Sequence, residues 1–218
     1  MIVDKQGWII MLEESASVLI NQKDVFSEID SKFGDGDHGI TIEKIALSIL
    51  KSCEQWKGSD DSIKKFFGSL GDAIVNIAGG SAGPLYGTFF VGMSEGLNDE
   101  VVCDLVVIKK MFEAAILELS YITNAKIGDK TMMDAILPAV QAISSSTGDL
   151  SELFANAAEA AIIGAKNSEQ FISKFGRAKS YKEATIGTPD AGAMSASALF
   201  TGLNEGFKKY QQGKEESI

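Results

Sequence analysis

The chain has 218 residues, and its 20 Lys and Arg against 30 Asp and Glu give a formal net charge of −10. This acidic balance argues against nucleic acid or an anionic membrane as the main partner. One His and two Cys exclude sites built on several imidazoles and zinc sites built on several thiolates. We therefore look for the chemistry of this chain among its carboxylates.

The chain is predicted to form one domain over residues 1–218, with a core at about 8–210, because no linker, low-complexity segment or solenoid repeat divides it. The first residues lack the basic start, long apolar run and cleavage site of a signal peptide. No stretch approaches the ~18 consecutive apolar residues of a membrane span. We expect a cytoplasmic protein in which Cys53 and Cys103 are reduced, buried thiols.

Apolar residues recur with helical spacing almost throughout the chain. The run over residues 101–108 is rich in β-branched residues, but it enters a helical stripe and is interpreted as the start of a helix. Short connections favour antiparallel neighbours. The pattern predicts an all-α fold of eight amphipathic helices, with apolar stripes over residues 8–20, 42–53, 63–77, 85–97, 105–119, 133–143, 150–164 and 194–207.

Four glycine-rich breaks between these helices carry most of the polar chemistry. Taken singly, each glycine is better explained by a turn or a helix C-cap. Four such loops in one chain instead indicate backbone that approaches a ligand, with helix N-termini directed at it. The loops read SKFGDGDHG, IAGGSAGPLYG, NAKIGDKT and FGRAKSYKEATIGTPDAGA.

The first loop brings Asp35 and Asp37 close together, with Asp30 five residues upstream of Asp35. Neighbouring carboxylates repel one another unless a cation lies among them, and hard oxygen ligands favour Mg²⁺ or Ca²⁺. The twelfth position from Asp35 is Ala46 rather than the Glu of an EF-hand, so we favour Mg²⁺ beside phosphate oxygens. The plainer alternative is that one Asp only caps the following helix.

His38 follows the two aspartates and is the only histidine. We expect it to contact phosphate or to orient an aspartate, although a lone histidine is more often structural. The amides from Gly39 to Thr41 begin a helix and are expected to point at phosphate oxygens. In the second loop, Gly79–Pro84 offers a further backbone contact, with Pro84 at a first helical position, or else forms only a tight turn.

The third and fourth loops are weaker signals. The GDKT segment at 128–131 fails the P-loop pattern because Asp129 separates the glycine from the lysine, so Asp129 is interpreted as an N-cap. Arg177, the only arginine in a lysine-rich chain, suits a bidentate phosphate contact, with an ordinary surface arginine as the alternative. The polar stretch from Arg177 to Asp190 suits a lid over a ligand.

These loops, in this order, resemble those of the ADP-binding L subunit of bacterial dihydroxyacetone kinases, a module that also forms the C-terminal domain of single-chain dihydroxyacetone kinases. The resemblance extends from Trp8 to about Tyr210, and it is specific because unrelated chains would not repeat all five of its motifs in one order. The motifs are GDGDHG at 34–39, GGSAGPLYGTFF at 79–90, GDKTM at 128–132, GRA at 176–178 and IGTPDAGA at 186–193.

The resemblance implies a closed barrel of eight antiparallel amphipathic helices, with ADP or ATP and two Mg²⁺ ions at one rim. It implies Asp30, Asp35 and Asp37 as metal ligands, and no catalytic group in this chain beyond charge stabilisation by Arg177. Thr123 and Met132 would lie on the adenine side. The residues implied to contact the nucleotide are His38, Gly39, Ile40, Thr41, Ser81, Ala82, Thr123, Met132, Arg177, Asp190, Ala191 and Gly192.

The resemblance also implies partners. An L subunit keeps its ADP, which a protein of the phosphoenolpyruvate-dependent phosphotransferase system converts to ATP, and it delivers the phosphoryl group to dihydroxyacetone held on a separate K subunit. Phosphoryl transfer depends mainly on positioning and charge neutralisation, so a chain with one histidine can fill this role. A homodimer is a further expectation from the family.

Three departures from the family pattern leave two other functions open. Ala191 stands where the family commonly reads Asp-Pro-Gly, the lid reads KSYKEATIG, and Thr123 replaces a common glycine. One alternative is an ATP-exchanging kinase subunit for another ketose such as erythrulose. The other is a non-catalytic, nucleotide-loaded module that binds a transcription regulator.

Overall fold

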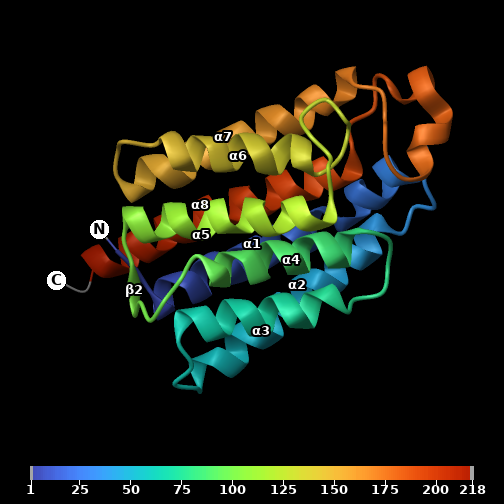
Figure 1. Ribbon diagram of the computed structural model, residues 1–218. Coiled ribbons are helices and arrows are strands. Elements are labelled where there is room, and N and C mark those ends of the chain that lie inside the picture. Colours follow the sequence, from blue (N-terminus) through green and yellow to red (C-terminus); the bar gives the residue numbers. More distant parts are fainter. Residues whose placement is uncertain (1, 217–218) are drawn as a thin grey trace.

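The computed structural model describes residues 2–216. Within this range the fold consists almost entirely of α-helices, which confirms the all-α prediction (Figure 1). The helices are α1 (Lys5–Asp30), α2 (His38–Lys57), α3 (Ile63–Val75), α4 (Ala82–Glu95), α5 (Leu105–Ile122), α6 (Met133–Ser145), α7 (Leu150–Asn167) and α8 (Ala191–Glu215). Strand β1 (Val3–Asp4) precedes α1, and β2 (Val102–Cys103) and the 3₁₀ segments η1 (Ser168–Gln170) and η2 (Arg177–Thr185) lie between helices.

Each α-helix coincides with one predicted apolar stripe. The interpretation of residues 101–108 as the start of a helix was wrong for its first residues, because Val102 and Cys103 form the strand β2. β2 pairs antiparallel with β1, so that Val3 lies opposite Cys103. Helix α5 begins only at Leu105. A strand of two residues is too short to show the alternation by which a sequence reveals a strand.

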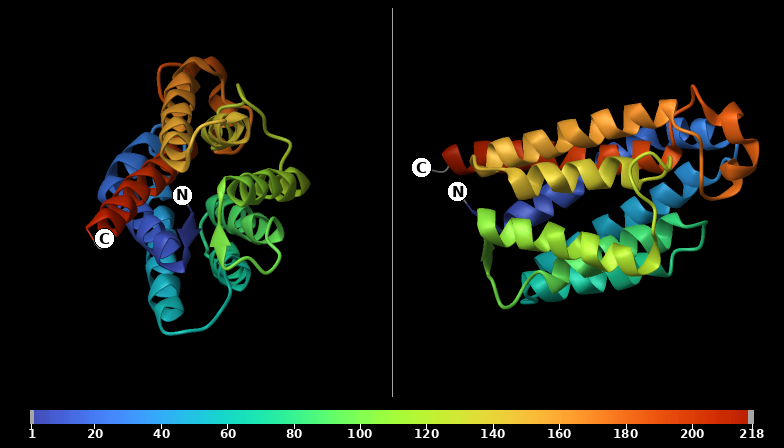
Figure 2. Two further views of the ribbon diagram at one scale, coloured as in Figure 1. Left: turned by 90° about the vertical axis from the view of Figure 1, so that its left-hand side faces the viewer. Right: turned by 45° about the horizontal axis from the view of Figure 1, so that its top comes forward.

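The helices run alternately in opposite directions, so their connections alternate between the two ends of the molecule (Figure 1 and Figure 2). Each helix contacts the next along the chain, and α8 packs extensively against α1. The four glycine-rich loops follow α1, α3, α5 and α7 and therefore gather at one end, while both chain ends lie at the other. This agrees with the predicted antiparallel order; the closed barrel remains a prediction. None of the described helices has the length and apolar character needed to cross a membrane.

One apolar core lies between the helices and takes residues from all eight of them. Aromatic rings connect its parts: Trp8 of α1 meets Phe67 of α3 edge-on with ring centroids 5.1 Å apart, and Phe89 of α4 meets Phe200 of α8 at 6.2 Å. Such pairs stabilise a fold by about 0.5–1.5 kcal/mol each beyond the burial of their area. The core thus fixes the positions of the helices whose ends form the pocket described below.

The two cysteines are buried and unpaired, as predicted. Burial raises the pKa of Cys103 to about 11 and that of Cys53 to about 12. Cys103 also accepts a hydrogen bond from the indole N–H of Trp8 at 3.4 Å. Both thiols therefore stay protonated at neutral pH and serve as packing groups.

Helices α1 and α8 approach closely because α8 carries two glycines one turn apart. A methyl group added at Gly202 would overlap the backbone of Ser15, and one at Gly206 would overlap that of Met11. Ser15 is itself buried, and its Oγ lies 2.9 Å from the Met11 carbonyl oxygen and 3.1 Å from that of Leu199. The backbones of the first and last helices therefore pack against each other with almost no side chain between them.

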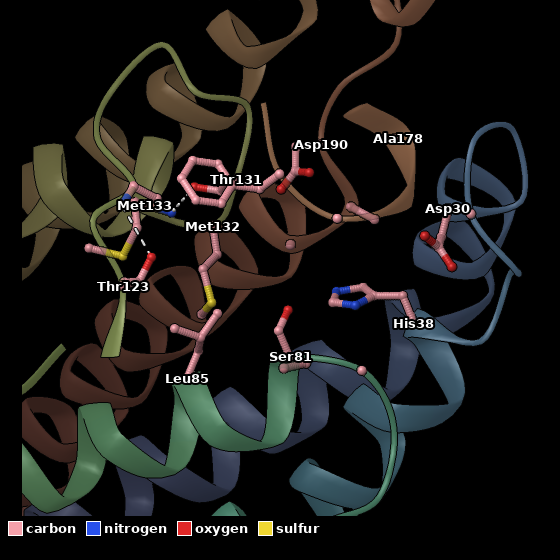
Figure 3. A pocket seen from close by; sticks show the side chains of 18 of the residues that line it. Asp30, His38, Ser81, Leu85, Thr123, Thr131, Met132, Met133, Ala178 and Asp190 are labelled. Carbon is pink, nitrogen blue, oxygen red and sulfur yellow. Dashed lines mark hydrogen bonds between the residues drawn. The ribbon is translucent and has the colours of Figure 1, made fainter. Parts of the chain in front are cut away.

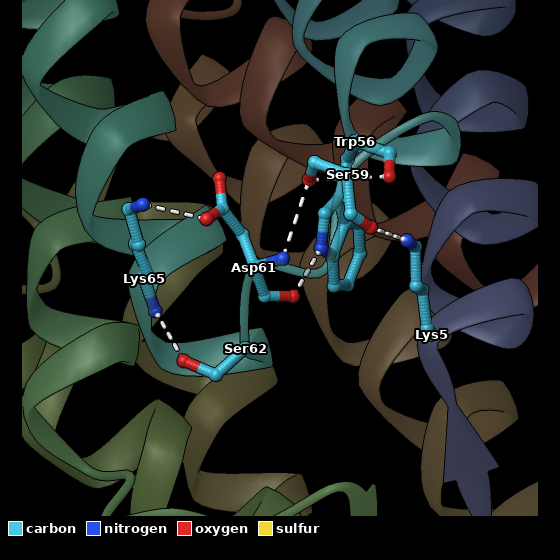
Figure 4. A network of polar contacts seen from close by, with 6 residues as sticks. All are labelled: Lys5, Trp56, Ser59, Asp61, Ser62 and Lys65. Carbon is cyan, nitrogen blue, oxygen red and sulfur yellow. Dashed lines mark hydrogen bonds and ion pairs between the residues drawn. The ribbon is translucent and has the colours of Figure 1, made fainter.

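The end opposite the glycine-rich loops is closed by a polar network around Trp56 (Figure 4). Lys5 Nζ donates to the Ser59 carbonyl at 2.6 Å, and the indole N–H of Trp56 donates to the Asp61 carbonyl at 2.8 Å. These bonds tie the connection between α2 and α3 to the start of α1. They hold the far end of the bundle in place without using any group of the glycine-rich loops.

Candidate functional site

A pocket of about 1100 Å³ lies at the end of the molecule where the glycine-rich loops gather. Figure 3 shows its two sides, with Asp30, His38 and Asp190 on a polar side and Thr123 and Met132 on the other. All but two of the predicted site residues line this pocket. The fold therefore brings together residues that lie far apart in the sequence.

Three carboxylates gather on the polar side. Oxygen atoms of Asp30, Asp35 and Asp37 lie within 4.8 Å of one another. Gly36, at φ 74°, turns the loop so that its N–H donates to Asp30 Oδ2 at 2.9 Å. The donor set consists of hard oxygen atoms at a spacing that a divalent cation can bridge, so it fits Mg²⁺.

Arg177 reaches this cluster from η2 and forms an ion pair with Asp35. It is the only arginine in the sequence. The guanidinium beside Asp35 holds the pKa of that carboxyl below its ordinary value. Next to this contact, Phe33 packs against Tyr181 with ring centroids 5.2 Å apart. The segment predicted to be a lid thus contacts the carboxylate loop directly.

Helices that begin at the pocket differ in their capping from those that begin at the far end. Helices α1, α3, α5 and α7 begin at the far end, and each is capped by a side chain: Asp4, Ser62, Asp104 and Asp149. Among the described helices that begin at the pocket, α8 is capped by Asp190, whereas Asp37, Ser81 and Met132 make no capping bond to α2, α4 and α6. At the starts of α2 and α6, the N–H groups of Gly39 and Met133 are bonded instead to the hydroxyls of Ser27 and Thr131. Helix α4 is therefore the one of these three that presents open N–H groups and partial positive charge to an anion.

Two amides predicted to bind phosphate are already used within the protein. The N–H of Gly39 donates to Ser27 Oγ at 3.2 Å, and the N–H of Thr41 donates to the Asp37 carbonyl at 3.0 Å. The prediction that these amides point at phosphate was therefore wrong. Thr41 makes the ordinary first bond of α2, and α2 packs so closely on α1 that a methyl group at Gly39 would overlap the α1 backbone. Gly39 and Ile40 are also the two predicted site residues that do not line the pocket.

His38 lies in the pocket, but its ring is held by neighbouring groups. Its Nε2 is 2.9 Å from Ser195 Oγ, and the ring also hydrogen-bonds to the Ala191 backbone. Burial lowers the pKa of His38 below its ordinary value, so the ring is mainly neutral at neutral pH. This geometry suits an orienting residue rather than a nucleophile.

The second glycine-rich loop reaches the pocket beside α2. Gly79, at φ 141°, passes so close to the Thr41 hydroxyl that a methyl group would overlap it. The Ser81 side chain points into the pocket (Figure 3). Pro84 was predicted at the first helical position, but it is the third residue of α4. Because proline has no N–H, the open amides of this helix are those of its first two residues, beginning at Ala82.

The other side of the pocket is mainly apolar. Thr123 and Met132 lie there with Leu85 and Met133 (Figure 3). Thr123 Oγ1 accepts a hydrogen bond from the Ala125 N–H at 3.1 Å, which fixes the turn that follows α5. Such a surface suits a flat, largely apolar ring whose polar part reaches the opposite side.

Lys130 had no predicted role, and it anchors the lid. Its buried ammonium group donates to the carbonyl of Ser168, in η1 before the lid, at 2.6 Å and to that of Thr188, within the lid, at 2.5 Å. Asp129 was predicted to be an N-cap, but it pairs with Lys174, just before the lid, at 2.6 Å, and α6 begins four residues later. The third glycine-rich loop is therefore the base on which the fourth is fixed.

Asp190, Ala191 and Gly192 lie at the start of α8 and line the pocket. Asp190 accepts a hydrogen bond from the Ala193 N–H at 2.8 Å, and its own N–H donates to Ser168 Oγ at 2.8 Å. Burial raises the pKa of Asp190 from 3.8 to about 7. The carboxyl group at this helix start is thus shared between its protonated and charged forms near neutral pH.

The raised pKa of Asp190 predicts a pH dependence of stability. Between 3.8 and about 7 the folded chain binds more protons at this group than the unfolded chain does, so its stabilising contribution is lost as the pH rises through this range. Asn caps a helix as well as Asp and does not titrate. We expect wild type to lose stability relative to Asp190→Asn as the pH rises, by up to about 1.4 kcal/mol per pKa unit. Urea unfolding across a pH series measures this, and a constant difference would contradict it.

Comparison with known proteins identifies a family to which the chain is similar. The DAK2 domain model matches residues 32–205. The ADP-binding subunit DhaL of PEP-dependent dihydroxyacetone kinase 1 from Listeria innocua is 32% identical, and the match covers 92% of this chain and 96% of that protein. The L-erythrulose kinase of Pectobacterium atrosepticum is 28% identical over 88% of this chain, which spans only 33% of that enzyme.

A solved structure shares the fold. The dihydroxyacetone kinase from C. freundii, in complex with AMP-PNP and Mg²⁺, matches with a TM-score of 0.68 at 22% identity. The match covers 89% of this chain and 33% of that one. At this level of identity the likeness supports the helical architecture.

Proposed function

Because the chain belongs to the DAK2 domain family, we propose that it is the nucleotide-binding, phosphoryl-transfer subunit of a dihydroxyacetone kinase. It binds ADP or ATP with Mg²⁺ and delivers the phosphoryl group to dihydroxyacetone held on a separate K subunit. The observation that carries the proposal is that the open start of α4 lies at a pocket that also holds three carboxylates. Open amides attract phosphate and carboxylates repel it, and a cation bound between them reconciles the two.

The carboxylates Asp30, Asp35 and Asp37 would hold the metal, with two ions in the proposed complex. Bound Mg²⁺ supplies positive charge that neutralises phosphate oxygens during transfer. The Gly36 N–H orients Asp30 for this role. Arg177 already lies beside Asp35 and would add its own charge from the lid side.

The other pocket residues would position the nucleotide. Ser81 and the open amides that begin at Ala82 support a phosphate contact, because α4 has no side-chain cap. Thr123 and Met132 would lie against the adenine ring on the apolar side. The start of α8 at 190–192 would close the polar side. Positioning and charge stabilisation are what phosphoryl transfer requires, so no covalent catalyst is assigned to this chain.

The finer parts of the proposal concern partners and donor. A protein of the phosphoenolpyruvate-dependent phosphotransferase system would rephosphorylate bound ADP in the cytoplasm, and the K subunit would dock to receive the phosphoryl group. A homodimer is part of the same proposal. Sedimentation of the purified chain as a monomer at all concentrations would remove the dimer and leave the rest intact.

A second candidate is an ATP-exchanging subunit for another ketose. The 28% identity to an L-erythrulose kinase and the divergent lid sequence favour it. A third candidate is a nucleotide-loaded module that binds a transcription regulator. Retention of a regulator by Asp35→Ala, with no phosphoryl transfer by wild type to any ketose-loaded partner, would favour that module.

The experiment that tests the proposal is mass spectrometry of nucleotide released from the native protein, purified with Mg²⁺ or with EDTA. We expect an adenine nucleotide that survives dialysis with Mg²⁺ and is lost with EDTA. A nucleotide that exchanges freely in Mg²⁺ would instead support the ATP-exchanging candidate. Absence of any adenine nucleotide, together with no gain in affinity on adding Mg²⁺, would contradict the site assignment.

A further inference from the structure

Two buried hydroxyl groups lie behind the His38 ring. Tyr86 of α4 is fully buried, and its hydroxyl donates to Ser195 Oγ at 2.9 Å. Ser195 of α8 is also fully buried, and its Oγ lies 2.9 Å from His38 Nε2. The three side chains form one continuous hydrogen-bonded chain that begins in the core and ends in the pocket.

The chemistry of these groups gives the chain a direction. Burial raises the pKa of Tyr86 far above its ordinary value, so its hydroxyl keeps its proton and acts as a donor to Ser195. Ser195 has one proton of its own, for which the Gly192 carbonyl at 3.0 Å is an acceptor, and the tautomer of the ring sets which of Ser195 and His38 donates to the other. Every polar atom of the two hydroxyls is therefore paired, as buried groups require.

The chain connects three helices that all begin at the pocket. His38 is the first residue of α2, Tyr86 is the fifth residue of α4 and Ser195 is the fifth residue of α8. Helix α2 packs mainly on α1 and has far less contact with α4 or α8. The Tyr86–Ser195–His38 chain is thus a polar link between helix starts that share little other packing.

We propose that Tyr86 and Ser195 are positioning residues that fix the imidazole of His38 at the phosphate end of the pocket. This role rests on the proposed nucleotide-binding function. Packing alone gives no reason for either hydroxyl, because Phe and Ala would fill the same space without burying polar atoms. The role of Ser195 is its hydrogen bond to the ring, and the role of Tyr86 is the hydrogen bond that holds Ser195.

The sole histidine of the sequence provides a direct readout, because its imidazole ¹⁵N signals need no assignment among several rings. We would compare wild type, Ser195→Ala and Tyr86→Phe at one fixed pH, without nucleotide. The matched control is Ser15→Ala, which removes another fully buried serine hydroxyl with two backbone contacts, far from His38 in the chain and in the α1–α8 contact. We expect the His38 signals to shift in Ser195→Ala, to shift less in Tyr86→Phe, and to stay unchanged in Ser15→Ala.

Nucleotide affinity, measured by calorimetry with MgADP on the same four proteins, completes the test. We expect Ser195→Ala to bind ~3- to 10-fold more weakly, the change expected for loss of one hydrogen bond, and Ser15→Ala to bind as wild type does. Unshifted His38 signals in both Tyr86→Phe and Ser195→Ala would overturn the positioning role. So would shifted signals with unchanged affinity, or an equal loss in Ser15→Ala. Failure of wild type itself to bind MgADP would overturn the proposed function, which is a separate result because the ¹⁵N signals are recorded without nucleotide.

Discussion

Replacement of Asp37 by Asn should remove most of the Mg²⁺-dependent nucleotide affinity while leaving the fold intact. Asp37 belongs to the group of three carboxylates within 4.8 Å, yet its side chain makes no capping bond to α2. Asn is as good an N-cap as Asp, so the substitution changes the charge and little else. The loss should be at least the ~10- to 100-fold seen when an outer-shell partner of a metal ligand is removed. Calorimetry with ADP, in Mg²⁺ and in EDTA, measures it.

Asp37 is a sharper choice than its two neighbours. Asp30 accepts the Gly36 N–H and Asp35 pairs with Arg177, so replacing either also disturbs the loop or the lid. The matched control is Asp104→Ala, which removes the side-chain cap of α5 at the far end. That variant should lose about 1 kcal/mol of stability and bind MgADP normally. Wild-type MgADP affinity in Asp37→Asn would show that Asp37 is not a metal ligand.

The second large effect is expected at the contact between α1 and α8. Gly202→Ala should lower the free energy of unfolding by about 1–3 kcal/mol, because the added methyl group overlaps the backbone of Ser15 and forces the two helices apart. The Ser15 hydroxyl bond to the Leu199 carbonyl would be strained by the same movement. Urea unfolding followed by circular dichroism measures the change.

The same helix offers a control of opposite sign. A methyl group at Gly213 of α8 meets no atom within 4 Å. Gly213→Ala should therefore stabilise the protein by about 0.5–1 kcal/mol, since Ala is the better helix former. If both variants stabilised the protein, helix propensity rather than packing would govern this contact, and the close approach of α1 and α8 would be contradicted.

The location of the pocket was within reach of the sequence. Helical periodicity is strong where one face of a helix is buried, so the eight stripes predicted the eight helices. Short connections make neighbouring helices antiparallel, and loops after every second helix must then share an end of the molecule. The motifs around Asp35, Ser81, Met132 and Asp190 lie in such loops. Their convergence follows from the topology alone.

Contacts across the fold were beyond the sequence. Lys130 bonds to carbonyls 38 and 58 residues away, and backbone carbonyls leave no trace in side-chain patterns. Tyr86 and Ser195 are 109 residues apart and look like ordinary core positions of their helices. The Gly39 amide appeared free because nothing in a sequence shows that Ser27 of the preceding helix lies within 3.2 Å. The apolar periodicity of a sequence predicts helices, but it does not predict how far apart two helices lie.

Both ends of the described chain lie at the end of the molecule away from the pocket, where Lys214 pairs with Asp4 at 3.2 Å (Figure 1). Polypeptide joined at either end would extend away from the site, which makes the unit easy to combine with other domains. In the C. freundii kinase the matching part is a third of a longer chain. Because the two described ends lie close together, a short peptide could link them, and new ends could be opened in another connection at the same end of the molecule. A circular permutant of this kind would leave the pocket at the opposite end unobstructed.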